Sequence, residues 1–149
     1  MFRSRARAGA AAAAPVQKPD RQWRAELTPL QYRVLRRHRT EPAFAGEFVE
    51  HDADGLYRCA GCRSELFRSG AKFASRAGWP SFSEPALAQS VERRRARRWL
   101  ARRTAVTCRR CGGHLGLVFG DGPTATGDRY CINSCVLAFE AAAPADGTA

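Results

Sequence analysis

Two Cys-x-x-Cys pairs constrain this chain more than any other feature of its sequence. Cys59 and Cys62 form the first pair and Cys108 and Cys111 the second, with residues 63–107 between them. The short spacing lets both thiolates of one turn bind the same ion, and four thiolates in a tetrahedral array favour zinc, or iron in some settings, and leave no position for substrate. We therefore expect one structural zinc ion per chain, which joins two distant segments. Two redox dithiols or two disulfides are the alternative.

The chain is strongly basic. Lysine and arginine total 25 against 14 aspartates and glutamates, for a formal net charge of +11. Such a balance attracts polyanions and acidic partners without specifying any of them, so arginine clusters at 93–98 and 102–103 leave nucleic-acid binding open. An apolar content of 44% is typical of a globular protein. No apolar run approaches the length needed to cross a bilayer, and we expect no membrane association.

Both ends of the chain are predicted to be tails around one domain at residues 23–140. Residues 1–22 carry spaced arginines, an alanine run and no acidic residue before Asp20. This composition predicts a disordered tail, with an organellar transit peptide as the alternative. Residues 141–149 are rich in alanine, proline and glycine and are predicted to be disordered too. We expect a cytoplasmic protein, or an organellar one if the N-terminus is a targeting segment.

The domain is predicted to contain a short helix followed by a mostly antiparallel β region. Thr28 can cap a helix that starts at Pro29, and Pro42 ends any helix nearby. Residues 86–103, with seven arginines, are predicted to be helical. Short apolar segments broken by Gly, Ser and Pro predict strands at 48–49, 56–58, 66–67, 105–107, 115–119 and 136–139.

Two cysteines, Cys131 and Cys135, remain outside the pairs. A buried thiol in a β protein is usually inert packing, and this reading stays open for both. Arg129, however, lies two residues before Cys131, so on an extended strand it projects to the same face and can favour the thiolate. Asn133 and Ser134 supply short polar donors next to the thiol. These features make Cys131 a candidate nucleophile.

Several short segments between Leu27 and Phe139 follow the pattern of a known family. They are Leu27-Thr28-Pro29, Gln31-Tyr32, Thr40-Glu41-Pro42, Phe44, Gly46, Gly78-Trp79-Pro80-Ser81-Phe82, His114-Leu115-Gly116, Asp121-Gly122-Pro123 and Arg129-Tyr130-Cys131-Ile132-Asn133-Ser134. Through these segments the chain resembles the zinc-containing, B-type methionine-R-sulfoxide reductases from about Leu27 to Phe139. Both cysteine pairs fall where the zinc-binding members carry theirs. The family implies a mainly β fold of two small antiparallel sheets with short N-terminal helices.

The resemblance implies thiol-dependent repair of oxidised proteins or peptides, and possibly of free methionine sulfoxide. Separately, we expect the protein to be a monomer. Cys131 attacks the sulfoxide sulfur while His114 or Asn133 protonates the oxygen, and Cys131 becomes a sulfenic acid. A second thiol then forms a disulfide with it, which thioredoxin or a similar dithiol reduces. By the same resemblance, Trp79 and Phe82 form the apolar wall that holds the S-methyl group of the substrate.

Three positions depart from the family pattern. Leu117 stands where the family has a second histidine, which leaves one acid group of two, and such help is commonly worth about 10²–10⁴-fold in rate. The usual Ser-His-Gly before the second cysteine pair is replaced, with Trp99-Leu100 near that place. Ala77 stands where many members carry a recycling cysteine. Cys135 then becomes a candidate resolving thiol, although four residues of strand span about 13 Å, too far for a disulfide without a turn.

Two other functions remain as alternatives. The first is a weakly active or inactive relative that binds oxidised methionine or a partner, and Leu117 is the residue that supports it. The second is a basic zinc-ribbon module that binds nucleic acid through the arginine clusters.

Overall fold

The computed structural model describes residues 14–95 and 103–143. Most of the predicted N-terminal tail, the predicted C-terminal tail from residue 144, Trp99-Leu100 and part of the arginine cluster lie outside the described residues. Within the described parts, no helix is both long enough and apolar enough to span a membrane.

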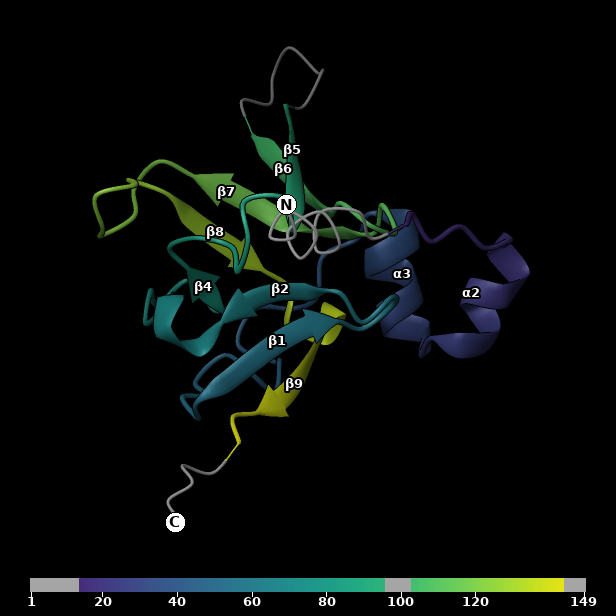
Figure 1. Ribbon diagram of the computed structural model, residues 1–149, viewed down its shortest axis with the longest axis horizontal. Coiled ribbons are helices and arrows are strands. Elements are labelled where there is room, and N and C mark those ends of the chain that lie inside the picture. The colour runs from purple at the N-terminus through teal and green to yellow at the C-terminus, as the bar shows by residue number, and fades with distance from the viewer. Residues whose placement is uncertain (1–13, 96–102, 144–149) are drawn as a thin grey trace, which may run out of the picture.

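Two helices lie on one side of the molecule (Figure 1). α2 spans Asp20–Glu26 and α3 spans Pro29–Arg37. The tail was predicted to extend to residue 22, and this boundary is wrong because α2 already begins at Asp20. The helix is held by tertiary contacts: Trp23 is buried in the core, and the Tyr32 hydroxyl of α3 donates to the Asp20 carboxylate at 2.6 Å.

The predicted start of α3 is confirmed and has a local cause. The Thr28 hydroxyl accepts the Gln31 backbone N–H at 3.1 Å, and the Gln31 side chain accepts the Thr28 backbone N–H at 2.9 Å. This reciprocal capping box satisfies two N–H groups that a helix start otherwise leaves unpaired. The helix ends at Arg37. The next residue, His38, has a left-handed backbone with φ 58° and ψ 37°, so the chain turns sharply there.

Two antiparallel sheets form the rest of the domain, which confirms the mainly β prediction. The smaller sheet has the strand order β2-β1-β9, and the larger has the order β3-β4-β8-β7-β6-β5. Two 3₁₀ turns, η1 (Ser69–Ala71) and η2 (Ser134–Val136), precede β3 and β9. The strands are β1 (Gly55–Cys59), β2 (Glu65–Arg68), β3 (Lys72–Phe73), β4 (Ser81–Phe82), β5 (Val91–Arg95), β6 (Thr104–Cys108), β7 (His114–Phe119), β8 (Arg129–Ile132) and β9 (Leu137–Ala141).

Three predicted elements differ from the structure. The helix predicted over 86–103 is wrong at least over Val91–Arg95, which form strand β5 and pair with β6 along their whole length. Pairing with a neighbouring strand overrides the weak helix preference of an arginine-rich segment. The strand predicted at 48–49 is a turn. The Phe48 side chain is buried in the core, and its backbone N–H donates to the Ser134 hydroxyl and not to a neighbouring strand. Val136 belongs to η2 and precedes β9.

The core lies where the two sheets meet. Tyr57 of β1, Phe67 of β2 and Phe82 of β4 are fully buried. The Phe67 and Phe82 rings stack with centroids 4.4 Å apart, and the Tyr57 ring meets Phe82 edge-on at 5.3 Å. These contacts bury large apolar areas and fix the larger sheet against the smaller one.

Candidate active site and metal site

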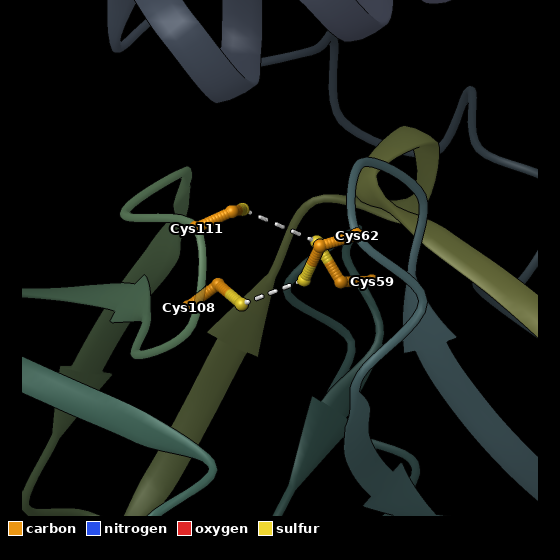
Figure 2. Close-up of side chains that lie close together, drawn as sticks. All are labelled: Cys59, Cys62, Cys108 and Cys111. Atoms are coloured by element: carbon orange, nitrogen blue, oxygen red, sulfur yellow. Dashed lines mark hydrogen bonds between the residues drawn. The ribbon is translucent and has the colours of Figure 1, made fainter. Parts of the chain in front are cut away.

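The two Cys-x-x-Cys turns come together at one place (Figure 2). The four sulfurs lie within 4.8 Å of one another, with 3.8 Å between Cys59 and Cys111 and 3.6 Å between Cys62 and Cys108. All four cysteines are free thiols, with no disulfide within or between the two pairs. Metal–sulfur bonds of about 2.3 Å in a tetrahedron hold the sulfurs about 3.8 Å apart. The four cysteines therefore fit a single metal ion.

The surroundings of this cluster are closed and basic. Cys59 and Cys108 are fully buried at the ends of β1 and β6. The Arg36 guanidinium donates to the Cys111 carbonyl at 2.9 Å and lies over the Trp23 ring at 4.6 Å. Positive charge beside the turns favours a cluster of thiolates. Since all four positions of the tetrahedron are filled by protein, the site serves structure and not substrate binding.

Cys131 lies in a different place, on the wall of a cavity of about 460 Å³. The strand register pairs Cys131 of β8 with Leu117 of β7 on one side and with Ser81 of β4 on the other. β7 approaches β8 closely because residue 116 is glycine, where a Cβ would lie 2.1 Å from the Cys131 carbonyl oxygen. Cavities of about 300–1,000 Å³ commonly hold small molecules. A group the size of a side chain can thus reach the Cys131 thiol.

Burial and charge act in opposite directions on Cys131. Burial raises the pKa of this thiol above its ordinary value, and the charge of Arg129 lowers it by a smaller amount. Arg129 lines the same cavity, as its spacing predicts, but its guanidinium is already bound to the Asp121 carboxylate at 2.9 and 3.3 Å. Arg129 therefore lowers the pKa of Cys131, as its position predicts, but burial raises this pKa by a larger amount.

His114 lies on the cavity wall as a buried imidazole. Burial, with a smaller contribution from His38, lowers the pKa of His114 to about 4, so the ring is neutral at pH 7. Its Nδ1 atom is buried without a hydrogen-bond partner in the part of the chain that the structure describes. The His38 ring stacks on it with centroids 5.2 Å apart and also lines the cavity. Sequence analysis missed His38, because the contact depends on where the left-handed end of α3 meets β7.

Asn133 holds the local backbone in place. Its side-chain N–H donates to the Leu115 carbonyl at 2.9 Å, and its side-chain oxygen accepts the Glu41 backbone N–H at 2.9 Å. Glu41 belongs to the Thr40-Glu41-Pro42 motif, and the sequence assigned it no role at the site. The residue is 3% exposed, and its carboxylate accepts the N–H groups of Ser134 at 2.6 Å and Cys135 at 2.9 Å. The two residues together fix the turn that follows Cys131.

Of the two residues predicted to form an apolar wall, only Trp79 lines the cavity. Its indole N–H donates to the Glu41 carbonyl at 3.1 Å. Phe82 does not line it: this side chain is fully buried against Phe67, because Phe82 follows Ser81 on β4 and neighbouring residues of a strand face opposite sides. Phe119 of β7 lines the cavity instead. Its alternation with Leu117 was the signal that could have found it.

Cys135 opens into another cavity, which also borders Leu30, Gln31 and Leu137. Burial, followed by the Glu41 carboxylate, raises the pKa of Cys135 to about 12. The chain is extended through Cys131, Ile132 and Asn133 before the 3₁₀ turn begins at Ser134. Cys131 and Cys135 therefore face different cavities, which argues against a disulfide between them.

Comparison with known proteins agrees with the resemblance seen in the sequence. The SelR domain family matches residues 27–141. The peptide methionine sulfoxide reductase MsrB of Thiobacillus denitrificans is 56% identical over 122 residues, which cover 82% of this chain and 92% of that protein. Its namesake from Bradyrhizobium diazoefficiens is 51% identical over 125 residues, which cover 84% of this chain and 90% of that protein. The chain therefore belongs to the SelR-domain family of MsrB methionine sulfoxide reductases.

Proposed function

We propose that this protein reduces methionine-R-sulfoxide in oxidised proteins and peptides to methionine, with Cys131 as the nucleophile. One observation carries the assignment of the nucleophile: of the six cysteines, four form the metal cluster, Cys135 borders another cavity, and Cys131 lines the cavity with an apolar wall. Membership of the MsrB family supports the reaction and its substrate.

The first step reduces the substrate and oxidises Cys131. The thiolate attacks the sulfoxide sulfur and forms a sulfur–sulfur bond, while the sulfur–oxygen bond of the substrate breaks and the protonated oxygen leaves as water. Water then attacks the Cys131 sulfur, the sulfur–sulfur bond breaks, methionine leaves and Cys131 becomes a sulfenic acid. The proton lost by the thiol is regained on the oxygen. His114 is neutral, so it assists by donating a hydrogen bond from its ring N–H rather than as an imidazolium acid. Trp79 and Phe119 hold the S-methyl group, since aromatic rings contact sulfur favourably.

The second step needs an external dithiol such as thioredoxin. One of its thiols condenses with the Cys131 sulfenic acid and releases water, and its second thiol then displaces Cys131 and leaves the dithiol oxidised. A resolving role for Cys135 has little support, because its thiol borders a different cavity and has a high pKa.

We also propose that zinc is the metal held by the four cysteines. Zinc accepts four thiolates in a tetrahedron with no redox change, and the sulfur distances fit that geometry. The ion serves folding, because its ligands come from the ends of β1 and β6 in different sheets. We also propose that the protein is a monomer and that it is located in the cytoplasm.

A stereospecific assay tests the proposed function. The wild-type protein with dithiothreitol reduces peptides that contain the R epimer of methionine sulfoxide and leaves the S epimer unchanged. Cys131→Ser abolishes turnover, whereas Cys135→Ser, the matched control, retains it. Mass spectrometry after one equivalent of substrate then finds a sulfenic acid on Cys131 and no Cys131–Cys135 linkage. Full activity of Cys131→Ser would refute the assignment.

A weakly active relative is the second candidate, and Leu117 favours it. Leu117 lies directly opposite Cys131 and presents an apolar side chain where a second acid group would serve the reaction. Leu117→His is expected to leave kcat/KM for the R epimer equal or raise it, by at most the roughly 10²-fold that a single acid group supplies at the low end. Leu117→Met, which stays apolar, controls for repacking. A clear loss in Leu117→His alone would mean that the cavity depends on leucine.

Nucleic-acid binding is not favoured. Three arginines near the β5–β6 edge lie beside carboxylates: Arg93 pairs with Asp128, and Arg94 and Arg109 lie near Glu92.

A further inference from the structure

We propose that the Cys131 cavity selects oxidised methionines flanked by acidic residues in their polypeptide, and that Arg103 makes this selection. The inference rests on the proposed function and goes beyond it, because it names the sequence context of the substrate. It comes from the charges on the cavity wall and from their position relative to the thiol.

The charged residues of the cavity wall are of one sign. Arg103 and Arg129 line the cavity, and none of its lining residues within the described chain is acidic. The Arg129 guanidinium is bound to the Asp121 carboxylate, whose negative charge offsets that of the guanidinium. Arg129 also lies over the Phe119 ring at 4.6 Å. Arg103 is exposed and has no carboxylate within ion-pair distance among the described residues. Arg103 therefore has positive charge available for a ligand.

The strand register places Arg103 beside the site. Thr104 of β6 pairs with Val118 of β7, so Arg103 lies one position beyond this pair, next to Phe119. Phe119 pairs in turn with Arg129 of β8. Arg103, which directly precedes β6, thus lies in one row with Phe119 of β7 and Arg129 of β8, and all three line the cavity.

This row lies within reach of the residues that neighbour the substrate methionine. Leu117 and Cys131 form the next row on the same face, two residues along each strand. Two residues of strand span about 6.6 Å, and an extended polypeptide advances about 3.3–3.6 Å per residue. With the sulfoxide at Cys131, a side chain one or two positions away in the substrate reaches the arginine row. A carboxylate there meets Arg103, whereas an ammonium group is repelled.

Three matched peptides test the proposal with the full-length protein. Each contains one central methionine-R-sulfoxide flanked on both sides by glutamate, glutamine or lysine, with blocked ends, and dithiothreitol is the reductant so that no protein partner contributes. We expect kcat/KM for the glutamate peptide to exceed that for the glutamine peptide about two- to fivefold, the range of exposed ion pairs, and the lysine peptide to be slowest. About 0.5 M salt shrinks the differences, because it screens exposed charges.

Two variants locate the effect. Arg103→Gln moves the ratio of kcat/KM between the glutamate and glutamine peptides close to one. Arg94→Gln removes the same charge from the neighbouring strand β5, outside the cavity lining, and keeps the preference. Equal kcat/KM for all three peptides, or an undiminished preference in Arg103→Gln, would each overturn the proposal. Failure to reduce the neutral glutamine peptide at all would instead refute the proposed function.

Discussion

At the scale of single residues, the reactivity of Cys131 is a balance between burial and one guanidinium. Burial disfavours the charged thiolate, and Arg129 offsets part of this cost from the same face of β8. Asp121 works against Arg129, since its carboxylate binds the guanidinium and raises the pKa of the thiol slightly. Leu117 adds no polar contact on the opposite strand. The site thus keeps its nucleophile mostly protonated at neutral pH.

Removing the charge of Arg129 should change the pH dependence in a defined direction. The thiolate is the reactive form and the pKa of Cys131 is raised, so kcat/KM of the wild type rises with pH throughout the range from 6 to 9. Arg129→Gln raises that pKa further and lowers kcat/KM at pH 7 by about tenfold, since a neighbouring charge commonly shifts a pKa by about one unit or more. Thiol alkylation rates measured against pH report the same shift. Arg129→Lys keeps the charge, so its kcat/KM at pH 7 should fall between those of the wild type and Arg129→Gln. Identical pH profiles of kcat/KM for all three proteins would contradict a role of this charge.

At the scale of elements, the turn after β8 depends on one buried carboxylate. Glu41 comes from the loop after α3, and its two oxygens accept the first N–H groups of η2. Its backbone is tied to Asn133 and Trp79, both of which line the cavity. The loop after α3 therefore helps to position the wall of the site through these hydrogen bonds.

Replacing this carboxylate should loosen the turn. Glu41→Gln keeps the size of the side chain but leaves one oxygen and supplies an N–H that faces another N–H group. The free energy of unfolding is expected to fall by about 1–3 kcal/mol, the cost of an unsatisfied buried group, and KM to rise as Trp79 and Asn133 lose their support. Glu47→Gln, on the exposed surface of the same loop, is the control and should be neutral. Denaturant unfolding and steady-state kinetics measure the two effects, and equal stability of both variants would exclude this role of Glu41.

At the scale of the whole molecule, two connections hold the sheets together. The aromatic cluster of Tyr57, Phe67 and Phe82 fills the space between them. The four cysteines join the end of β1 in the smaller sheet to the end of β6 in the larger one. Trp23 of α2 packs beside the same place, which brings the N-terminal helices into the core.

Loss of the metal should therefore destabilise the whole domain. Elemental analysis of the purified protein is expected to find one zinc ion per chain. Chelation or Cys108→Ser should lower Tm by roughly 10 °C or more, since binding of a structural zinc ion contributes directly to folding free energy. Cys135→Ser removes a thiol outside the cluster and should retain both the metal and Tm. A chelated, metal-free protein that melts at the same temperature would rule out a structural metal.

Much of this protein could be read from local sequence. The capping box needs only Thr28 and Gln31, the paired cysteines need only their spacing, and strand alternation places Arg129 and Cys131 on one face. These features depend on residues a few positions apart, where backbone geometry decides the outcome.

The remaining features depend on tertiary structure. Pairing with β6 made residues 91–95 a strand, and Phe67 of the smaller sheet stacks on Phe82 and covers it in the core. Burial made His114 neutral, and the end of α3 set His38 against it. Strand pairing and burial join residues far apart in the chain, and local periodicity carries no information about which partner a segment meets.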